Sequence, residues 1–146
     1  MIEIPSSILR EIYDHMETSY PYECCGLLIG TDSAGERTVH AARRCRNLNT
    51  ERAHDRYEMD PKCQIAAQRE FADSPWDIVG VYHSHPDHPS RASQKDTDRA
   101  WPNWSYVIVS VQKGKVESAQ SWVLSENESE KRFDEEPLIV DEGDRK

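Results

Sequence analysis

The spacing of apolar residues predicts a helix near the start of the chain and a buried strand after it. Within residues 6–19 the apolar positions fall at i, i+1, i+4, i+5 and i+8, the spacing of one face of an amphipathic helix. These positions are Ile8, Leu9, Ile12, Tyr13 and Met16. Pro5 precedes the predicted helix and Pro21 ends it. Residues 25–30 form a short apolar run bounded by glycine, which is typical of a buried strand.

Beyond residue 30 the pattern predicts mainly strands, with a helix over residues 61–72 and a further one capped by Ser93. Residues 31–36 are typical of a turn, and residues 47–56 form a polar stretch that predicts a loop. Asp60 and Pro61 provide an N-cap and a first-turn proline for a helix over residues 61–72. Four further segments are predicted as strands: 38–45, 77–85, 105–111 and 115–124.

The order of these elements predicts an α/β or α+β fold with one mixed sheet and flanking helices. A chain of 146 residues is long enough for one domain with a sizeable core and too short for two. We expect that domain to span residues 1–125 and an acidic tail to span residues 126–146, where nine acidic and four basic residues give a net charge of −5. Either the tail is disordered, or its apolar segment 137–140 adds an edge strand or docks on the domain. The residues do not decide between these alternatives.

Composition argues against several classes of protein. The 18 Lys and Arg against 27 Asp and Glu give a net charge of −9, whereas a nucleic acid-binding domain is usually basic. No apolar run approaches the ~18 residues of a transmembrane helix. The first residues also lack the basic and apolar regions of a secretory signal. We therefore expect a cytoplasmic globular domain that binds neither nucleic acid nor a membrane.

The four cysteines do not suggest a zinc or redox centre of their own. They are Cys24, Cys25, Cys45 and Cys63, and no pair has the C-x-x-C spacing. Without a secretion signal, all four are expected to be reduced thiols. Cys24 and Cys25 are adjacent, so on a strand their side chains point to opposite faces.

Two histidines at the end of a predicted strand are the first candidate metal ligands. His83 and His85 are two residues apart, so both imidazoles project from the same face of the strand. Two neighbouring imidazoles need partners for their ring nitrogens, and zinc is one that suits them. The alternative is a pair of ordinary polar histidines at a strand end.

Asp96 is a third candidate ligand. Ser93 and Asp96 have the spacing of a capping box, with serine at the N-cap and an acid at the third helical position. Capping alone explains both residues, yet an acid in the first turn of a helix that follows the histidines can also point back at a metal. Two His and one Asp leave a fourth position for water, as in catalytic rather than structural zinc sites.

Two families of zinc proteins carry similar patterns. The stretch from His83 to His88 spells H-x-H-x-D-H, which resembles the metallo-β-lactamase superfamily. That fold needs further histidine ligands downstream, and the sequence has none after His88. The chain is also short for that fold, so this resemblance fails.

The second resemblance covers residues 6–124. His83-Ser84-His85-Pro86, with ten residues between His85 and Asp96 and a serine three positions before Asp96, resembles the JAMM motif of the MPN+ metalloprotease family. Upstream, residues 23–30 (ECCGLLIG) match the family pattern E-x-C-G-x-L-x-G position by position. The resemblance implies a single MPN/JAMM-type domain with a mixed central β-sheet flanked by helices, a cytidine-deaminase-like sandwich.

The resemblance also implies an activity and the roles of five residues. The family hydrolyses peptide or isopeptide bonds with Zn²⁺, which His83, His85 and Asp96 would hold with water as the fourth ligand. Glu23 would be the general base that activates the zinc-bound water, and then the acid for the leaving amine. Ser93 would donate a hydrogen bond to the oxyanion or hold the water. Without the resemblance, Glu23 would be interpreted as a surface carboxylate in front of a strand.

The size of the chain is similar to the prokaryotic stand-alone members of the family. For these the resemblance implies a substrate that is the C-terminal Gly-Gly tail of a ubiquitin-like or sulfur-carrier protein, bound as an extended strand. The alternative function is a non-catalytic MPN-type binding or scaffold module. Such a module is expected to have lost part of the motif.

Five further residues near the motif have more ordinary explanations. Cys25 is expected to be a small core residue beside the site rather than a nucleophile. Asp87 and His88 are expected at the rim of the site or in a turn. Trp101 and Trp104 are expected to pack in the core or at a strand edge, or to floor a peptide groove.

Overall fold

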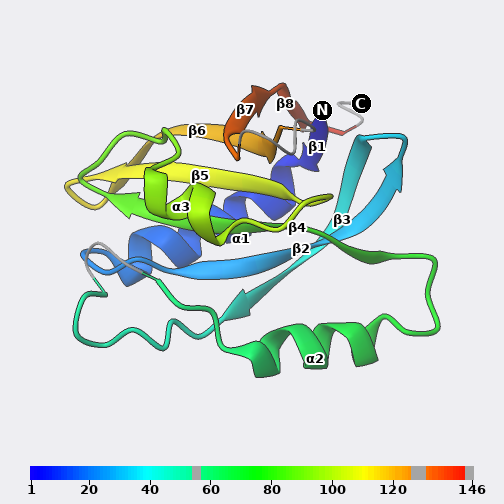
Figure 1. Cartoon of the computed structure of the whole chain (residues 1–146), viewed down its shortest axis with the longest axis horizontal. Helices are drawn as coiled ribbons and strands as arrows, with labels where there is room; N and C mark the ends of the chain where they lie inside the picture. Colours follow the sequence, from blue (N-terminus) through cyan, green and yellow to red (C-terminus); the bar gives the residue numbers. More distant parts are fainter. Residues whose placement is uncertain (54–56, 126–130, 144–146) are drawn as a thin grey trace.

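The computed structural model describes residues 1–53, 57–125 and 131–143. Within these ranges eight strands form one sheet in the order β7-β6-β5-β4-β2-β3-β1-β8 (Figure 1). The strands are β1 Ile2–Pro5, β2 Cys25–Ser33, β3 Glu36–Cys45, β4 Asp77–Pro86, β5 Ser105–Gln112, β6 Lys115–Leu124, β7 Phe133–Glu136 and β8 Leu138–Asp141. The helices are α1 Ser6–Ser19, α2 Pro61–Glu70 and α3 Gln94–Arg99. No helix in the described ranges is long and apolar enough to cross a membrane.

The predicted fold class is confirmed, because the sheet is mixed and carries helices on both faces. β4 runs parallel to β5, and β1 runs parallel to β3 and β8, whereas the other pairs are antiparallel. Figure 1 shows α1 behind the sheet and α3 in front of it. The apolar residues of α1 share one cluster with Leu28 of β2, and Ala67 of α2 belongs to the second cluster, with Leu27 and Ile29.

Most predicted elements occur with small shifts at their ends. α1 has the predicted bounds, while α2 ends at Glu70 rather than at residue 72. The predicted turn at residues 31–36 is shorter, because β2 and β3 continue pairing to Ser33 and Glu36. Only Ala34 and Gly35 form the turn, both with positive φ, and Asp32 Oδ1 accepts the backbone N–H of Gly35.

The segment after residue 130 reaches both edges of the sheet. β7 pairs with β6 at one edge and β8 pairs with β1 at the other, although only Pro137 separates the two strands. The Pro137 carbonyl accepts the backbone N–H of Ile2. Of the alternatives left open by the sequence, an edge strand is therefore observed at residues 138–141. The boundary between a domain over residues 1–125 and a tail stays a prediction.

Two of the four cysteines, Cys45 and Cys63, are not the reduced thiols that the sequence predicted. Cys45 and Cys63 form a disulfide with a Cα–Cα distance of 5.6 Å, so the prediction of four reduced thiols is wrong for these two. The fold brings the end of β3 beside the first turn of α2, a proximity that the sequence spacing does not reveal. Cys24 and Cys25 are free thiols and belong to the clusters on opposite faces of the sheet, as predicted.

Candidate metal centre

His83 and His85 project from the same face near the end of β4, as the sequence predicts. Their ring centroids lie 5.0 Å apart. His83 is flanked by Cys25 on β2 and Ile108 on β5, and its side chain is completely buried. Both of its ring nitrogens are therefore shielded from solvent.

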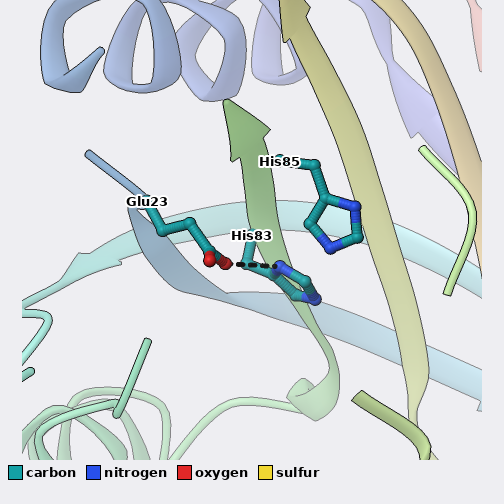
Figure 2. A group of neighbouring side chains, drawn as sticks. All are labelled: Glu23, His83 and His85. Carbon is teal, nitrogen blue, oxygen red and sulfur yellow. Dashed lines mark ion pairs between the residues drawn. The ribbon is translucent and has the colours of Figure 1, made fainter. Parts of the chain in front are cut away.

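Glu23 approaches His83 from the residues just before β2. The antiparallel register pairs Cys25 with His83, and the intervening backbone is fixed because the Cys24 carbonyl accepts the backbone N–H of Ser84 at 3.1 Å. Glu23 Oε1 lies 3.5 Å from His83 Nδ1, and Figure 2 shows the carboxylate pointing at this ring. The residue is only 6 % exposed. Glu23 is therefore a buried group of the site and not a surface carboxylate.

Asp96 reaches the same place from the first turn of α3. One carboxylate oxygen, Oδ1, lies 3.3 Å from His83 Nε2, and the other, Oδ2, lies 3.2 Å from His85 Nε2. The capping box predicted for this helix is also present, since Ser93 Oγ accepts the N–H of Asp96 and Asp96 Oδ2 accepts the N–H of Ser93. The two explanations of Asp96, as a cap and as a group of the site, therefore hold together.

The electrostatics of this cluster favour a charged carboxylate. Burial by itself would raise the pKa of Asp96, but the hydrogen bond with His85, the charge of His83 and the Ser93 N–H together hold it well below its usual range. Burial lowers the pKa of His85, yet the hydrogen bond and the charge of Asp96 outweigh burial and raise it. The site therefore has a strong preference for positive charge beside Asp96.

The ring of His85 is oriented for a ligand at Nε2. Its Nδ1 lies 2.8 Å from the Pro89 carbonyl oxygen, which can only accept a hydrogen bond. Nδ1 therefore carries a proton, and in the neutral imidazole Nε2 presents a lone pair to the site. A carbonyl that fixes the far nitrogen of a histidine in this way is the usual arrangement behind metal ligands.

The residues present fit a metal ion. Both ring nitrogens of His83 are buried and lack a hydrogen-bond partner within the described residues, and such orphaned polar atoms are costly. One ligand atom from each of Glu23, His83 and His85 lies within 4.8 Å of the others (Figure 2). A cation bound here would take one ring nitrogen from each histidine, and a set of imidazole nitrogens with a carboxylate is a donor set that suits zinc.

The other residues singled out from the sequence lie around this centre. Burial raises the pKa of the Cys25 thiol to about 12, as expected of a core residue and not of a nucleophile. Asp87 accepts hydrogen bonds from Tyr20 Oη and from the backbone N–H of Lys113, so its carboxylate braces a turn. Ser93 Oγ serves as the cap of α3, and its predicted catalytic role stays a prediction.

Two further residues of the site were not singled out from the sequence: Asn47 begins the predicted polar loop at residues 47–56, and Tyr57 directly follows it. The ring of Tyr57 stacks on His83 with a centroid distance of 4.4 Å. The side-chain amide of Asn47 donates a hydrogen bond to the backbone carbonyl of Glu23. The one signal for Tyr57 is that it is a large aromatic residue after a run of polar ones; Asn47 has no such signal.

A pocket of about 400 Å³ opens beside the metal centre and shares Tyr57 with it. Its lining includes the aromatic residues Trp101, Trp104 and Tyr106 besides Tyr57, together with the acidic residues Glu58 and Asp60. Trp101 is 67 % exposed. Of the roles expected for the tryptophans, the lining of a groove next to the site therefore describes Trp101 better than core packing.

Comparison with known proteins decides the family. A model of prokaryotic homologs of the JAB domain matches residues 5–125. The chain belongs to this prokaryotic JAB family. This match confirms the resemblance to JAMM/MPN+ enzymes that the motifs indicate. The chain is therefore an enzyme of the isopeptidase type.

Two relatives in the family have assigned names. A desampylase of Haloferax volcanii is 36 % identical over 105 residues, covering 71 % of this chain and 73 % of the relative. A desampylase of Pyrococcus furiosus is 34 % identical over 126 residues, covering 84 % and 81 %.

Solved structures show the same fold. A protein from Desulfitobacterium hafniense superposes with a TM-score of 0.83 at 30 % identity, covering 98 % of this chain and 94 % of the other. A JAB1/MPN domain protein from Archaeoglobus fulgidus superposes with a TM-score of 0.59 at 16 % identity, covering 94 % and 97 %. The second match supports the fold alone.

Proposed function

We propose that this chain is a zinc-dependent hydrolase that cleaves the bond after the C-terminal Gly-Gly of a ubiquitin-like or sulfur-carrier protein. The observation that carries the proposal is the position of Asp96, whose two carboxylate oxygens face His83 Nε2 and His85 Nε2 at 3.3 and 3.2 Å. The carboxylate of Glu23 lies next to the other ring nitrogen of His83, Nδ1. Three metal ligands and a separate carboxylate are the parts that a metallopeptidase needs.

In this proposal His83, His85 and Asp96 hold the zinc ion. Bound there, zinc supplies Lewis-acid chemistry, which acidifies a water molecule and polarises the scissile carbonyl. Glu23 takes a proton from the attacking water at its carboxylate and delivers it to the leaving amine. Its burial in the site keeps the carboxylate away from competing solvent.

Ser93 supplies a hydrogen-bond donor in this proposal. Its Oγ accepts the backbone N–H of Asp96, and a hydroxyl that accepts one hydrogen bond still has its own proton to donate. We assign that donor to the oxyanion that forms on the scissile carbonyl. Because Ser93 caps α3 and Asp96 lies in its first turn, the helix fixes the donor relative to the metal ligand.

The shape of the site supports a tail with small side chains at the scissile bond. His83 is completely buried and Glu23 almost so, which favours a substrate chain that can approach closely, as glycine residues can. The aromatic pocket next to Tyr57 offers a surface for the residues that flank the glycines. Both named relatives are desampylases, which supports a protein modifier as the substrate.

The alternative of a non-catalytic scaffold module is less well supported. A scaffold has no need of a complete set of ligands, yet all five residues of the motif are present. Four of them lie close together. Within ion-pair distance are the pairs Glu23–His83, His83–Asp96 and Asp96–His85.

The test uses the full chain reconstituted with zinc. One substrate is a ubiquitin-like carrier joined through its C-terminal Gly-Gly to a lysine side chain, and the second is the same carrier extended by one amino acid. We expect mass spectrometry to show release of the carrier ending in Gly-Gly from at least one of them. The His83→Ala/His85→Ala variant is the control and should release none. Binding of both carriers without zinc-dependent cleavage of either would favour the scaffold module.

A further inference from the structure

Both backbone polar groups of Glu23 form hydrogen bonds with the stretch of chain that follows β3, at Asn47 and Ala53. The N–H of Glu23 donates to the Ala53 carbonyl, and the carbonyl of Glu23 accepts a hydrogen bond from Asn47 Nδ2 at 3.1 Å. β2 begins only at Cys25. The main chain that carries the proposed general base is therefore held from outside the sheet.

The side chain of Asn47 organises this segment as well as reaching Glu23. Its Oδ1 accepts the backbone N–H of Asn49 at 3.0 Å and that of Glu58 at 2.9 Å. Its backbone forms an isolated bridge with Met59. Among the described residues, the amide oxygen therefore accepts from Asn49 and Glu58, and the amide nitrogen donates to Glu23.

Backbone hydrogen bonds join the residues around Asn47 to residues 58–60. The Arg46 carbonyl accepts the N–H of Asp60 at 3.0 Å, and the Glu58 carbonyl accepts the N–H of Leu48 at 2.7 Å. The disulfide between Cys45 and Cys63 lies just outside these pairs. These contacts therefore join the residues on both sides of Asn47 to residues 58–63.

We propose that Asn47 is a positioning residue, whose side-chain amide holds the main chain of Glu23 so that the carboxylate stays directed at the site. Asn47 acts through Glu23 and does not itself contact the substrate. As a role in catalysis, this assignment rests on the proposed hydrolase function. The contact it invokes, between Asn47 Nδ2 and the Glu23 carbonyl, can also be tested without activity.

Asn47→Asp separates the two uses of the side chain. Aspartate keeps an oxygen for the N–H groups of Asn49 and Glu58, but it has no N–H to donate to Glu23. We expect kcat to fall on the order of 10- to 100-fold, as for a misplaced catalytic group, with KM and zinc content unchanged. Asn49→Asp adds the same charge two residues away and keeps the acceptor for the Arg52 N–H. This matched control should retain the wild-type kcat.

Hydrogen exchange of the Glu23 amide in the metal-free protein gives a readout independent of activity. We expect exchange to be about tenfold faster in Asn47→Asp than in Asn49→Asp, because the backbone of Glu23 loses one of its two hydrogen bonds to this stretch of chain. Asn47→Ser, neutral and too short to reach Glu23, should show the same change in exchange and the same loss of kcat.

Each outcome decides the proposal. Wild-type kcat in Asn47→Asp, or unchanged exchange at Glu23, overturns the positioning role and leaves the hydrolase function standing. A wild-type protein that cleaves nothing removes the hydrolase function, while exchange still decides whether Asn47 holds Glu23. If both Asn47 variants lose their circular-dichroism signal for folded protein, the role of Asn47 is purely structural and the proposal is wrong.

Discussion

Asp96 and His85 meet across the candidate metal centre, with the carboxylate Oδ2 3.2 Å from the imidazole Nε2. One residue lies on α3 and the other on β4. The same Oδ2 accepts the backbone N–H of Ser93 at 2.8 Å. The capping box of α3 therefore sets the direction of the carboxylate, and the helix and the proposed zinc site depend on one side chain.

Asp96→Asn should separate the metal site from the helix cap. The asparagine keeps an oxygen for the Ser93 N–H but loses the negative charge, so we expect zinc affinity to fall about 100-fold or more while α3 is retained. Competition titration against a chromophoric chelator measures the affinity, and circular dichroism the fold. Asp87→Asn is the matched control, since that carboxylate braces a turn with Tyr20 and Lys113. Equal zinc affinity in Asp96→Asn and wild type would show that Asp96 is not a ligand.

His15 should make stability depend on pH below neutrality. Burial, with a smaller effect of the Arg44 charge, lowers the pKa of His15 to about 4, while in the unfolded chain it is ordinary, about 6.5. The unfolded state therefore binds more protons between these values, so stability is complete above pH 6.5 and is lost as the pH falls towards 4. Because His15 is only partly buried, we expect a loss of about 1–2 kcal/mol.

Urea unfolding at pH 7.5 and at pH 4.5 measures this contribution. His15→Gln removes the titrating group and keeps an acceptor for the Tyr82 hydroxyl, which lies 2.7 Å from His15 Nδ1. The variant should lose less stability than wild type over the same interval. An identical loss in both proteins would assign the pH dependence to other groups.

The motif glycine Gly26 is required by Tyr82. A Cβ at residue 26 would overlap the ring of Tyr82, which is buried and cannot move aside. We expect Gly26→Ala to lower the free energy of unfolding by about 1–3 kcal/mol, the usual cost of overpacking. In the Tyr82→Leu background the same substitution should cost less, and thermal unfolding of the four proteins measures the coupling. A cost independent of residue 82 would contradict this explanation.

The disulfide between Cys45 and Cys63 should stabilise the fold. It joins residues 18 apart in the sequence, and in the chain-entropy model a loop of this length contributes about 3 kcal/mol. We expect a thiol reductant to lower the melting temperature of wild type. Cys63→Ser should melt near the temperature of the reduced wild type, and the reductant should have no effect on it. An effect of equal size on Cys63→Ser would mean that the reductant acts elsewhere.

The sequence predicted those features that depend on local pattern. The period of the apolar residues located α1, and the two-residue spacing of His83 and His85 placed both rings on one face. Asp96 was identified because its spacing from the histidines belongs to a known motif. The Cys45–Cys63 disulfide and the contacts of Asn47 and Tyr57 were missed, because they arise only when β3, the following segment and α2 fold against one another. The edge strand β8 was left open for the same reason, since its partner β1 lies at the other end of the chain.

The most direct test of the account is the rate at which zinc-loaded Glu23→Gln cleaves a Gly-Gly isopeptide bond, compared with zinc-loaded wild type. Glutamine has nearly the same shape as glutamate but cannot accept and return the proton. The account predicts that the variant keeps about one zinc per chain and that its kcat falls on the order of 10²- to 10⁴-fold, the usual contribution of a general base. A variant that cleaves at the wild-type rate would contradict the account, because the proton would then not pass through Glu23.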